Sequence, residues 1–490
     1  MKYKIIGLSV TALVLAMVIT VSFMMPTDNG ERYHQHIDAE EKAACAHTDT
    51  ALCTHLPIIK IDTRGAAIPG EPILISPGGD TLEYSMSETG EETIPAGFAV
   101  VDNAGRNNHT EDPAAVSSDI RIRIRGNSSR HFEKKGYIIK MVTPEGLNNP
   151  QSVMGMDSHH EWALHGPYLD KTLIRNYVCY NIAGEIMDYA PNVRFCELIL
   201  NGEYQGLYLL AETITAGKEG ARLELSVNKK DNTFSGYLLR LDRGSNTELK
   251  NINNLSLYTY KTENRINIVY PGNDNLTPEL ADGICEDFSA FEKALYSYDY
   301  DSDEFGYENY IDVDSFIDYY LINEFTSNYD AGSKSTYVYK GIDGKLHMCV
   351  WDFNNAFDNY QENETSYEMF YIQNGLWYDM LFKDEDFVER LIDRYYELEK
   401  KYLNDEYLNS YIDGVIEYLG PAIDRNFERW GHSFLPEWDR LFDFYRNLHS
   451  YDEAVSQLKG YIENRHCWMN ENIEILRQYS AESKVKNYNY

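Results

Sequence analysis

The chain has 490 residues, a formal net charge of −34, and 43% hydrophobic and 13% aromatic residues. Its length suits two or more domains or one two-lobed catalytic unit, and its hydrophobic content can form sizeable cores. The strong negative charge excludes a general nucleic-acid-binding surface, which needs a basic stripe. It also argues against docking on anionic lipid.

The N-terminus differs in character from the rest. Lys2 and Lys4 precede an uncharged apolar run, Ile5–Met25, which is long enough to cross a bilayer. No small-x-small cleavage site follows, so we predict an uncleaved signal anchor over residues 1–25, with a cleaved signal peptide as the alternative. Either places the remainder outside the cytoplasm by the positive-inside rule, anchored or secreted.

A polar linker follows over residues 26–55 and contains Cys45 and Cys53, the only closely spaced pair among seven cysteines. Outside the cytoplasm such a pair can form a disulfide that staples a polar segment. The chain has no CxxC motif, so a zinc ribbon or a thioredoxin-type site is not supported.

From Leu56 the pattern indicates strands, although proline and glycine punctuate residues 64–113 and predict turns and an irregular insertion there. Arg121–Arg125 alternates strictly, as a half-buried strand should. Gly126–Ser129 is typical of a turn, and Lys135–Val142 predicts a further strand.

The next elements are one helix and more strands. Apolar residues at near-helical spacing predict an amphipathic helix over Asp170–Asp188. Arg194–Leu200 and Gly206–Leu210 flank Asn201-Gly202, a hairpin-turn signal, and Gly236–Asp242 predicts another strand. Helical patterns dominate after Thr277, over residues 278–298, 314–328 and much of 385–478. The fold class is therefore α+β, with a β-rich half followed by a helical half.

A hairpin inside the helical half is the most informative feature. Ser335–Lys340 and Lys345–Val350 read as strands around an Asp-Gly turn. Because a hairpin returns the chain to its start, Asp330 and Asp352 should lie near one another. Paired carboxylates bind divalent metal or divide the roles of base and metal ligand in phosphoryl transfer. The alternative is two solvated loop residues of an acidic chain.

Two weaker signals lie upstream. The turn Arg125–Arg130 offers small residues and flanking arginines that could cover phosphates, although any hairpin turn favours such residues. Lys140 ends an apolar strand and could hold nucleotide phosphates as a point charge, although a lysine at a sheet edge is common without such a role.

Taken in order, these segments resemble the CotH kinase family, the spore-coat-protein-H type of atypical protein kinase. The resemblance covers roughly residues 56–430. It rests on RGNSS (125–129), KKGYIIK (134–140), WALHGPYLDKTLIRN (162–176), GLYLLAE (206–212), GYLLRLD (236–242) and the segment 323–359.

The resemblance implies a divergent two-lobed protein-kinase-like fold, with a β-rich N-lobe over 56–213 that carries one main helix. A mostly helical C-lobe over 214–480 would include a catalytic hairpin, 328–359, before a tail, 481–490. It further implies ATP and Mg²⁺ or Mn²⁺ as cofactors, with transfer of the γ-phosphoryl group to Ser/Thr of secreted, surface or coat proteins.

The resemblance also implies roles for single residues. Asp330 would be catalytic and Asp352, with Asn354, would hold metal. Residues expected at ATP are Arg125, Gly126, Asn127, Ser128, Lys140 and, second to it, Lys135. Possible supporting residues are Arg175, Asn176, Asn328, Lys334 and Ser335.

Three positions depart from the family pattern. Asn354 stands where the family often has aspartate, Asp358 where it has glycine, and Ser335 where ordinary kinases have asparagine. The departures at Asn354 and Ser335 keep one alternative open, a pseudokinase-like surface or coat scaffold. A further alternative keeps the same fold and changes the chemistry to nucleotidyl (AMP) transfer. The sequence does not identify the substrate or the source of ATP.

Overall fold

The computed structural model describes residues 32–43, 45, 52–75, 81–217, 221–259, 265–359, 364–435 and 448–481. Residues 35–490 form one compact unit, separate from residues 1–34. The predicted anchor, 1–25, lies outside the described residues. Among those that are described, no helix is both long enough and apolar enough to span a bilayer.

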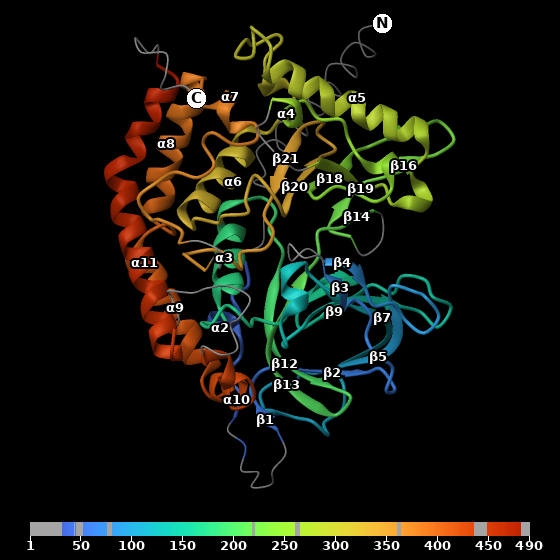
Figure 1. Ribbon diagram of the computed structural model, residues 1–490. Helices are drawn as coiled ribbons and strands as arrows, with labels where there is room; N and C mark the ends of the chain where they lie inside the picture. Colours follow the sequence, from blue (N-terminus) through green and yellow to red (C-terminus); the bar gives the residue numbers. More distant parts are fainter. Residues whose placement is uncertain are drawn as a thin grey trace, which may run out of the picture. The chain divides into compact units, whose positions relative to one another are not determined.

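The β-rich half contains a closed barrel of seven strands, in the order β11-β13-β12-β2-β5-β7-β8. All neighbours are antiparallel except β12 and β2. In Figure 1 the barrel strands lie within the blue-to-green part of the chain, where β2, β5, β7, β12 and β13 are labelled. The strands are β2 (Ile58–Asp62), β5 (Ile94–Val101), β7 (Val116–Arg125), β8 (Gly136–Val142), β11 (Glu161–His165), β12 (Val193–Leu200) and β13 (Glu203–Glu212).

The alternating segment predicted as a strand is the last half of β7. Ile120, Ile122 and Ile124 are buried in the barrel core, and the arginines between them face outward. Across the register, Arg121 lies opposite Lys140 of β8, which lies opposite Glu161 of β11. The alternation therefore places a row of cationic side chains on the outside of the barrel.

The prediction of an irregular insertion over residues 64–113 was wrong for its central part, which contains β5. Pro95 and Gly97 look like strand breakers in the sequence. In the barrel, however, pairing with β2 begins only at Gly97, so Pro95 lies beyond that pairing. Its missing N–H therefore costs no hydrogen bond with β2.

The helical half is built on a four-stranded sheet in the order β19-β18-β20-β21. The predicted hairpin is confirmed as β20 and β21, with Tyr337 opposite Cys349 and Lys340 opposite Leu346. Figure 1 shows the hairpin in orange beside β18. The strands are β18 (Tyr237–Asp242), β19 (Arg265–Tyr270), β20 (Thr336–Lys340) and β21 (Leu346–Cys349).

Helices cover this sheet and share one large apolar core with it. The red helix α11 packs along α9 and also contacts α6 (Figure 1). The α-helices are α2 (Gln35–Asp38), α3 (Arg175–Ile186), α4 (Leu255–Tyr258), α5 (Pro278–Leu295), α6 (Val313–Phe325), α7 (Tyr378–Leu381), α8 (Glu385–Glu399), α9 (Asp405–Leu419), α10 (Pro421–Trp430) and α11 (Tyr451–Asn472).

Short elements complete the chain. The remaining strands are β1 (Cys53–Thr54), β3 (Pro72–Ile75), β4 (Thr81–Tyr84), β6 (Asn108–His109), β9 (Gln151–Val153), β10 (Met156–His159), β14 (Ala216–Gly217), β15 (Leu223–Glu224), β16 (Val227–Asn228) and β17 (Thr233–Phe234). The 3-10 helices are η1 (Ser128–His131), η2 (Glu248–Lys250), η3 (Asn273–Asn275), η4 (Tyr307–Asn309), η5 (Gly431–Phe434) and η6 (Ile473–Tyr479).

Helix α3 begins five residues later than the sequence predicted. The Asp170 carboxylate accepts hydrogen bonds from the Thr172 hydroxyl (2.6 Å) and the Arg175 backbone N–H (2.9 Å). Leu173 between them has a φ of +67°, outside the helical region. A capping turn thus replaces the first helical turn and places Arg175 and Asn176 at the start of the helix.

Helix α10 ties the helical half to the barrel. Arg425 pairs with the fully buried Glu197 of β12 at 2.9 Å. The Asn426 side-chain oxygen accepts hydrogen bonds from Lys134 Nζ (2.7 Å) and the Leu207 backbone N–H (3.2 Å). Because these partners come from β12, β13 and the segment before β8, the helix fixes one side of the barrel.

A buried ion pair joins α11 to α6. Arg465 and Glu324 have fully buried side chains and pair at 2.9 Å. The same guanidinium donates to the backbone carbonyls of Tyr367 and Met369, each at 2.7 Å. Removing one partner of such a pair leaves an uncompensated buried charge.

We therefore expect Arg465→Met to lower the free energy of unfolding by about 3–5 kcal/mol in urea titrations. The matched control is Arg477→Met, which breaks an Arg–Glu pair whose side chains are 39% and 43% exposed. The control should leave the unfolding midpoint unchanged. Equal effects of the two substitutions would contradict the structural role of Arg465.

Candidate active site

One cleft of about 790 Å³ collects most of the residues that the sequence singled out. One wall comes from the outer face of β7 and β8 and from the turn after β7. The other comes from the end of β18 and from the segments just before β20 and just after β21. The predicted site residues that line it are Arg125, Gly126, Asn127, Ser128, Lys140, Asp330, Lys334, Ser335, Asp352 and Asn354.

The turn after β7 has a backbone that only glycine fits at its first position. Gly126 has a φ of +100°, and a Cβ there would lie 1.8 Å from the Ser129 hydroxyl oxygen. Arg130 braces the turn by donating to the Gly126 carbonyl at 2.6 Å and stacking over the Tyr84 ring. The Tyr84 hydroxyl donates to the Asn127 side chain at 3.3 Å. The loop therefore holds its shape without a ligand.

Arg125 connects this turn to the end of the β20–β21 hairpin. It donates to His165 Nδ1 at 2.9 Å and lies over the Trp351 ring at 5.4 Å. Burial, together with the charge of Arg125, holds the pKa of His165 well below its ordinary value, so the imidazole is neutral and can accept this hydrogen bond. The positive charge of Arg125 also opposes the rise of the Asp352 pKa.

The structure separates the two candidate lysines. Lys140 is half-buried and lines the cleft. Lys135 is not among the lining residues; it pairs with Glu71 at 2.8 Å and donates to the Arg130 carbonyl at 2.6 Å. Lys135 therefore stabilises the turn through these two contacts. Of the two lysines, Lys140 is the one that lines the cleft.

Asp330 lies at the start of the hairpin with its side chain 23% exposed. Burial raises the pKa of this carboxyl, and the nearby charge of Asp352 adds to the rise, against the opposing charge of Lys334. Asn355 donates to its Oδ2 at 2.8 Å, and Lys334 Nζ lies 3.8 Å from its Oδ1. The carboxylate is thus oriented by one amide and faces one cation.

Asp352 follows the hairpin in an unusual conformation, with a φ of +64°. Its backbone N–H donates to the Tyr180 hydroxyl of α3 at 3.0 Å. Burial raises the pKa of its carboxyl, and its Oδ1 is buried with no hydrogen-bond partner. A left-handed non-glycine residue and an unsatisfied buried carboxylate oxygen are both costly, and such features cluster at functional sites.

Asn176 of α3 holds the residues after Asp352. Its side-chain oxygen accepts from the Phe353 N–H at 2.9 Å, and its Nδ2 donates to Asn354 Oδ1 at 2.6 Å. The neighbouring Arg175 donates to the Ala356 carbonyl at 3.0 Å. Both residues predicted as supporting therefore position the segment that contains Asp352 and Asn354.

The other predicted supporting residues lie around the two aspartates. Asn328 is buried and donates to Asn323 at 3.0 Å and, weakly, to the Asp352 carbonyl at 3.5 Å. Ser335 has a φ of +50° and lines the cleft. Lys334 is the cation beside Asp330.

The sequence reasoning did not assign the residues at the end of β18. Arg240, Asp242 and Arg243 all line the cleft. The charge of Asp242 adds to the rise of the Asp352 pKa, and that of Arg243 opposes the rise at Asp330. The available signal was the end of the strand pattern GYLLRLD, where charged residues replace apolar ones next to a glycine.

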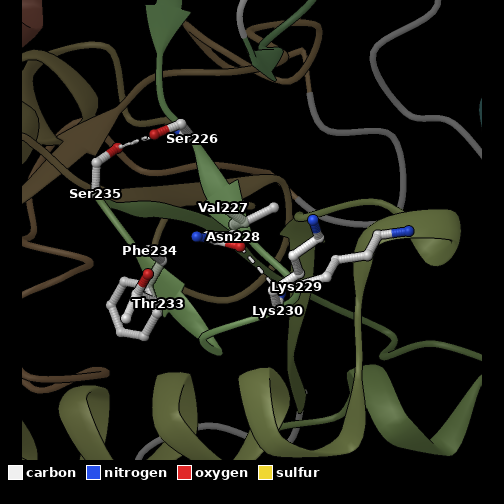
Figure 2. A pocket seen from close by; sticks show the side chains of 8 residues that line it. All are labelled: Ser226, Val227, Asn228, Lys229, Lys230, Thr233, Phe234 and Ser235. Atoms are coloured by element: carbon white, nitrogen blue, oxygen red, sulfur yellow. Dashed lines mark hydrogen bonds between the residues drawn. The ribbon is translucent and has the colours of Figure 1, made fainter.

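A second hollow lies on the β16–β17 hairpin. Its lining residues all come from residues 226–235 and none is shared with the cleft. Figure 2 shows the Lys229 and Lys230 side chains extending to the same side, away from Phe234. The lining of this hollow contains no carboxylate, histidine or cysteine that could bind a metal ion, so the cleft is the candidate active site.

The cleft residues fit a hard divalent cation. Mg²⁺ and Mn²⁺ prefer carboxylate and amide oxygens, and Asp352 offers a buried oxygen that no protein group satisfies. Asp242 and Asn354 also line the cleft and offer oxygens. Asn354 Oδ1 already accepts a hydrogen bond from Asn176, and Asp242 Oδ1 accepts from Arg243.

Comparison with known proteins agrees with this organisation. The family model described as CotH kinase protein matches residues 122–469, which include every candidate site residue. The chain belongs to the CotH kinase family. It is 23% identical over 366 residues to the inner spore coat protein H of Bacillus subtilis (strain 168), covering 73% of this chain and 88% of that protein. The family resemblance seen in the sequence is thus confirmed.

In this CotH-family chain we expect Asp352→Asn to stabilise the metal-free protein at pH 7, by on the order of 1 kcal/mol, because it removes a poorly compensated buried charge. A raised pKa means that the folded state binds the proton more tightly than the unfolded chain. Ionisation therefore costs stability at neutral pH, and the cost disappears below the unfolded pKa of about 4.

The measurement is urea unfolding in EDTA at pH 7 and at pH 4, and the gain should be clearly smaller at pH 4 than at pH 7. The control is Asp301→Asn, which alters an exposed aspartate and should change stability at neither pH. A loss of stability in Asp352→Asn at pH 7 would show that the carboxylate is satisfied in the protein.

Proposed function

We propose that the chain is a metal-dependent protein kinase of CotH type, which transfers the ATP γ-phosphoryl group to Ser/Thr of extracytoplasmic, surface or coat proteins. In this proposal the barrel half serves as the N-lobe and the helical half as the C-lobe of a divergent protein-kinase-like fold. The observation that carries it is the meeting of Asp330, Asp352 with its unsatisfied Oδ1, and Lys140 in one cleft.

The cleft has the charge pattern that phosphoryl transfer needs. Lys140, Arg123 and Arg125 lie on the barrel wall, and Arg240 and Arg243 on the β18 wall, in a chain of net charge −34. Cations gathered in a cleft of an acidic protein attract a polyanion to that cleft. The rigid turn at Gly126–Ser129 would cover the phosphates with backbone N–H groups.

Asp352, with Asn354 or Asp242 beside it, would hold Mg²⁺ or Mn²⁺. The ion, when bound, supplies neutralisation of the phosphate oxygens. The chain's own contribution is to keep Asp352 Oδ1 buried and without a hydrogen-bond donor, on a residue that lines the cleft.

Asp330 would act on the protein substrate. Its raised pKa moves the carboxylate toward the range in which a general base works near neutral pH. The Ser/Thr hydroxyl oxygen forms a bond to the γ-phosphorus while the bond to the β–γ bridging oxygen breaks. The hydroxyl proton passes to Asp330, and ADP leaves. Asn355 keeps one carboxylate oxygen oriented during this step.

The name of the Bacillus relative supports a coat or surface location for this chain, and the apolar run at residues 5–25 supports an uncleaved anchor. We include the coat or surface location and the membrane anchor in the proposed function. The acceptor would then be a secreted, surface or coat protein, and ATP must reach the same compartment.

A pseudokinase-like scaffold is the second candidate. It is favoured by Asn354, whose amide oxygen is already engaged by Asn176, and by Ser335 in place of asparagine. A scaffold of this kind would bind partners through the same surface without transferring phosphate.

Two aspartate variants separate the candidate functions. Asp352→Ala should abolish metal-dependent ATP binding in calorimetry, because it removes the predicted metal ligand. Asp330→Asn should keep that binding and lower the rate of transfer by about 10²–10⁴-fold, the usual contribution of a general base.

The readout of transfer is intact-mass analysis of the chain and of added surface-protein extract after incubation with ATP and Mn²⁺. Addition of phosphate that is absent in Asp330→Asn supports the kinase. An AMP adduct would instead identify nucleotidyl transfer. Unchanged ATP–metal affinity in Asp352→Ala would overturn the assignment of the cleft.

The two lysines provide a matched comparison of charge removal. Lys140→Met should weaken ATP binding about 10–150-fold, the equivalent of one hydrogen bond to a charged group. Lys135→Met removes the same charge from the other side of the turn and should weaken ATP binding less than about threefold, since Lys135 pairs with Glu71. The measurement is ATP affinity by calorimetry, and the reverse order of effects would exclude Lys140 as the phosphate-binding lysine.

A further inference from the structure

A cluster of two thiols and one imidazole lies on the barrel, among residues that the cleft does not use. One ligand atom each from Cys45, Cys53 and His109 lies within 4.8 Å of the other two. Cys45 Sγ is 3.2 Å from His109 Nε2. All three residues are partly buried, and the two sulfurs are not joined in a disulfide.

Local structure brings these residues together from three segments of the sequence. Cys53 of β1 lies directly opposite His109 of β6 in an antiparallel pair. Shortly before Cys45, Ala43 forms a bridge with Arg106, and Lys42 pairs with Asp102 at 3.1 Å. The residues of the cluster therefore come from parts of the chain that contact one another at several points.

The groups around the cluster are those that orient metal ligands. Asp112 Oδ2 lies 3.3 Å from His109 Nδ1 and accepts from the His109 backbone N–H at 2.9 Å. A proton held on Nδ1 by a carboxylate leaves Nε2 as the electron-pair donor, as in carboxylate–histidine–zinc arrangements. Asn107 Nδ2 lies 3.4 Å from Cys53 Sγ and can donate to that sulfur.

We propose that Cys45, Cys53 and His109 bind a thiolate-preferring divalent cation of the Zn²⁺ class. Two thiolates and one imidazole are a common zinc ligand set, and three protein ligands leave a fourth position for water. Zn–S distances of about 2.3 Å and Zn–N distances of about 2.0 Å place tetrahedral ligand atoms roughly 3.5–3.8 Å apart. Side-chain shifts of about 1 Å would close the cluster to that size. Binding releases the two thiol protons.

Two other uses of these residues explain less of the site. A Cys45–Cys53 disulfide, which the sequence suggested, would use neither the imidazole nor Asp112. A thiol–imidazole hydrogen bond between Cys45 and His109 would not need Cys53 or the amide of Asn107. A metal ion uses every group of the cluster and would clamp the segment around Cys45 to the loop between β5 and β7.

The site is independent of the phosphoryl-transfer proposal, and its test needs no ATP. The full chain, purified under reducing conditions, is loaded with Zn²⁺, dialysed and measured for bound zinc, and Co²⁺ replaces Zn²⁺ for spectroscopy. We expect about one zinc per chain and a thiolate-to-cobalt charge-transfer band in the near ultraviolet. Cys45→Ser and Cys53→Ser should each reduce zinc affinity at least tenfold and weaken the band. His109→Ala should also reduce affinity at least tenfold.

Two further variants guard against loss of folding as the cause. Asp112→Asn keeps all three ligands and should weaken zinc binding about 10–100-fold, as loss of an orienting partner does. Cys467→Ser alters an exposed cysteine on α11 and should leave zinc content, the cobalt band and the circular dichroism spectrum unchanged.

Two results would overturn the proposal. One is a reduced wild-type chain that retains no zinc after dialysis, whether or not the unreduced chain shows a Cys45–Cys53 cross-link by mass. The other is a set of cluster variants that bind zinc as tightly as the wild type.

Discussion

The hydrogen bonds from helix α3 to the segment after the β20–β21 hairpin are the constraint on which the cleft depends. Asp352 adopts a left-handed backbone that costs roughly 1 kcal/mol or more for a residue of its type. Tyr180 accepts the N–H of Asp352, and Asn176 contacts both Phe353 and Asn354. Without these contacts the turn would relax, and the carboxylate would point elsewhere.

The start of the same helix is held by contacts with two other parts of the chain. Asp170 caps its first turn, and Arg175 reaches from that turn to the carbonyls beyond Asp352 and to Gln457 of α11. The start of α3, the segment after the β20–β21 hairpin and α11 are therefore one hydrogen-bonded assembly. Because the wall opposite is a barrel that α10 braces, both sides of the cleft are held by elements distant in sequence.

Short-range patterns predicted the elements well. The alternation of Arg121–Arg125 and the Asp-Gly turn of the hairpin involve neighbouring residues, so their strands and pairing could be read directly. Strand β5 was missed because the tolerance for Pro95 depends on where β2 stops pairing, a property of the barrel and not of the segment. The start of α3 was misplaced because a side-chain cap at Asp170 overrides the helical pattern.

The cleft contains most of the site residues that the sequence predicted, but the sequence did not predict how their side chains are arranged in space. Lys140 and Lys135 differ in sequence only by position, and their difference appears when Glu71 from a distant loop pairs with Lys135. Asp242 ends the GYLLRLD segment and Arg243 follows it. Neither was given a role from the sequence, yet their charges act on the two aspartates. Which charged residues share the cleft depends on contacts between segments that lie far apart in the sequence. No local pattern in a single sequence shows those contacts.

The most direct test of the central claim is a crystal structure of the chain with Mn²⁺ and a non-hydrolysable ATP analogue, with the metal located by its anomalous signal. The claim predicts a manganese peak about 2.1–2.2 Å from Asp352 Oδ1, with the triphosphate between it and Lys140 and with Asp330 facing the γ-phosphate. A nucleotide bound outside the cleft, or a manganese ion in the cleft that does not contact Asp352, would contradict it.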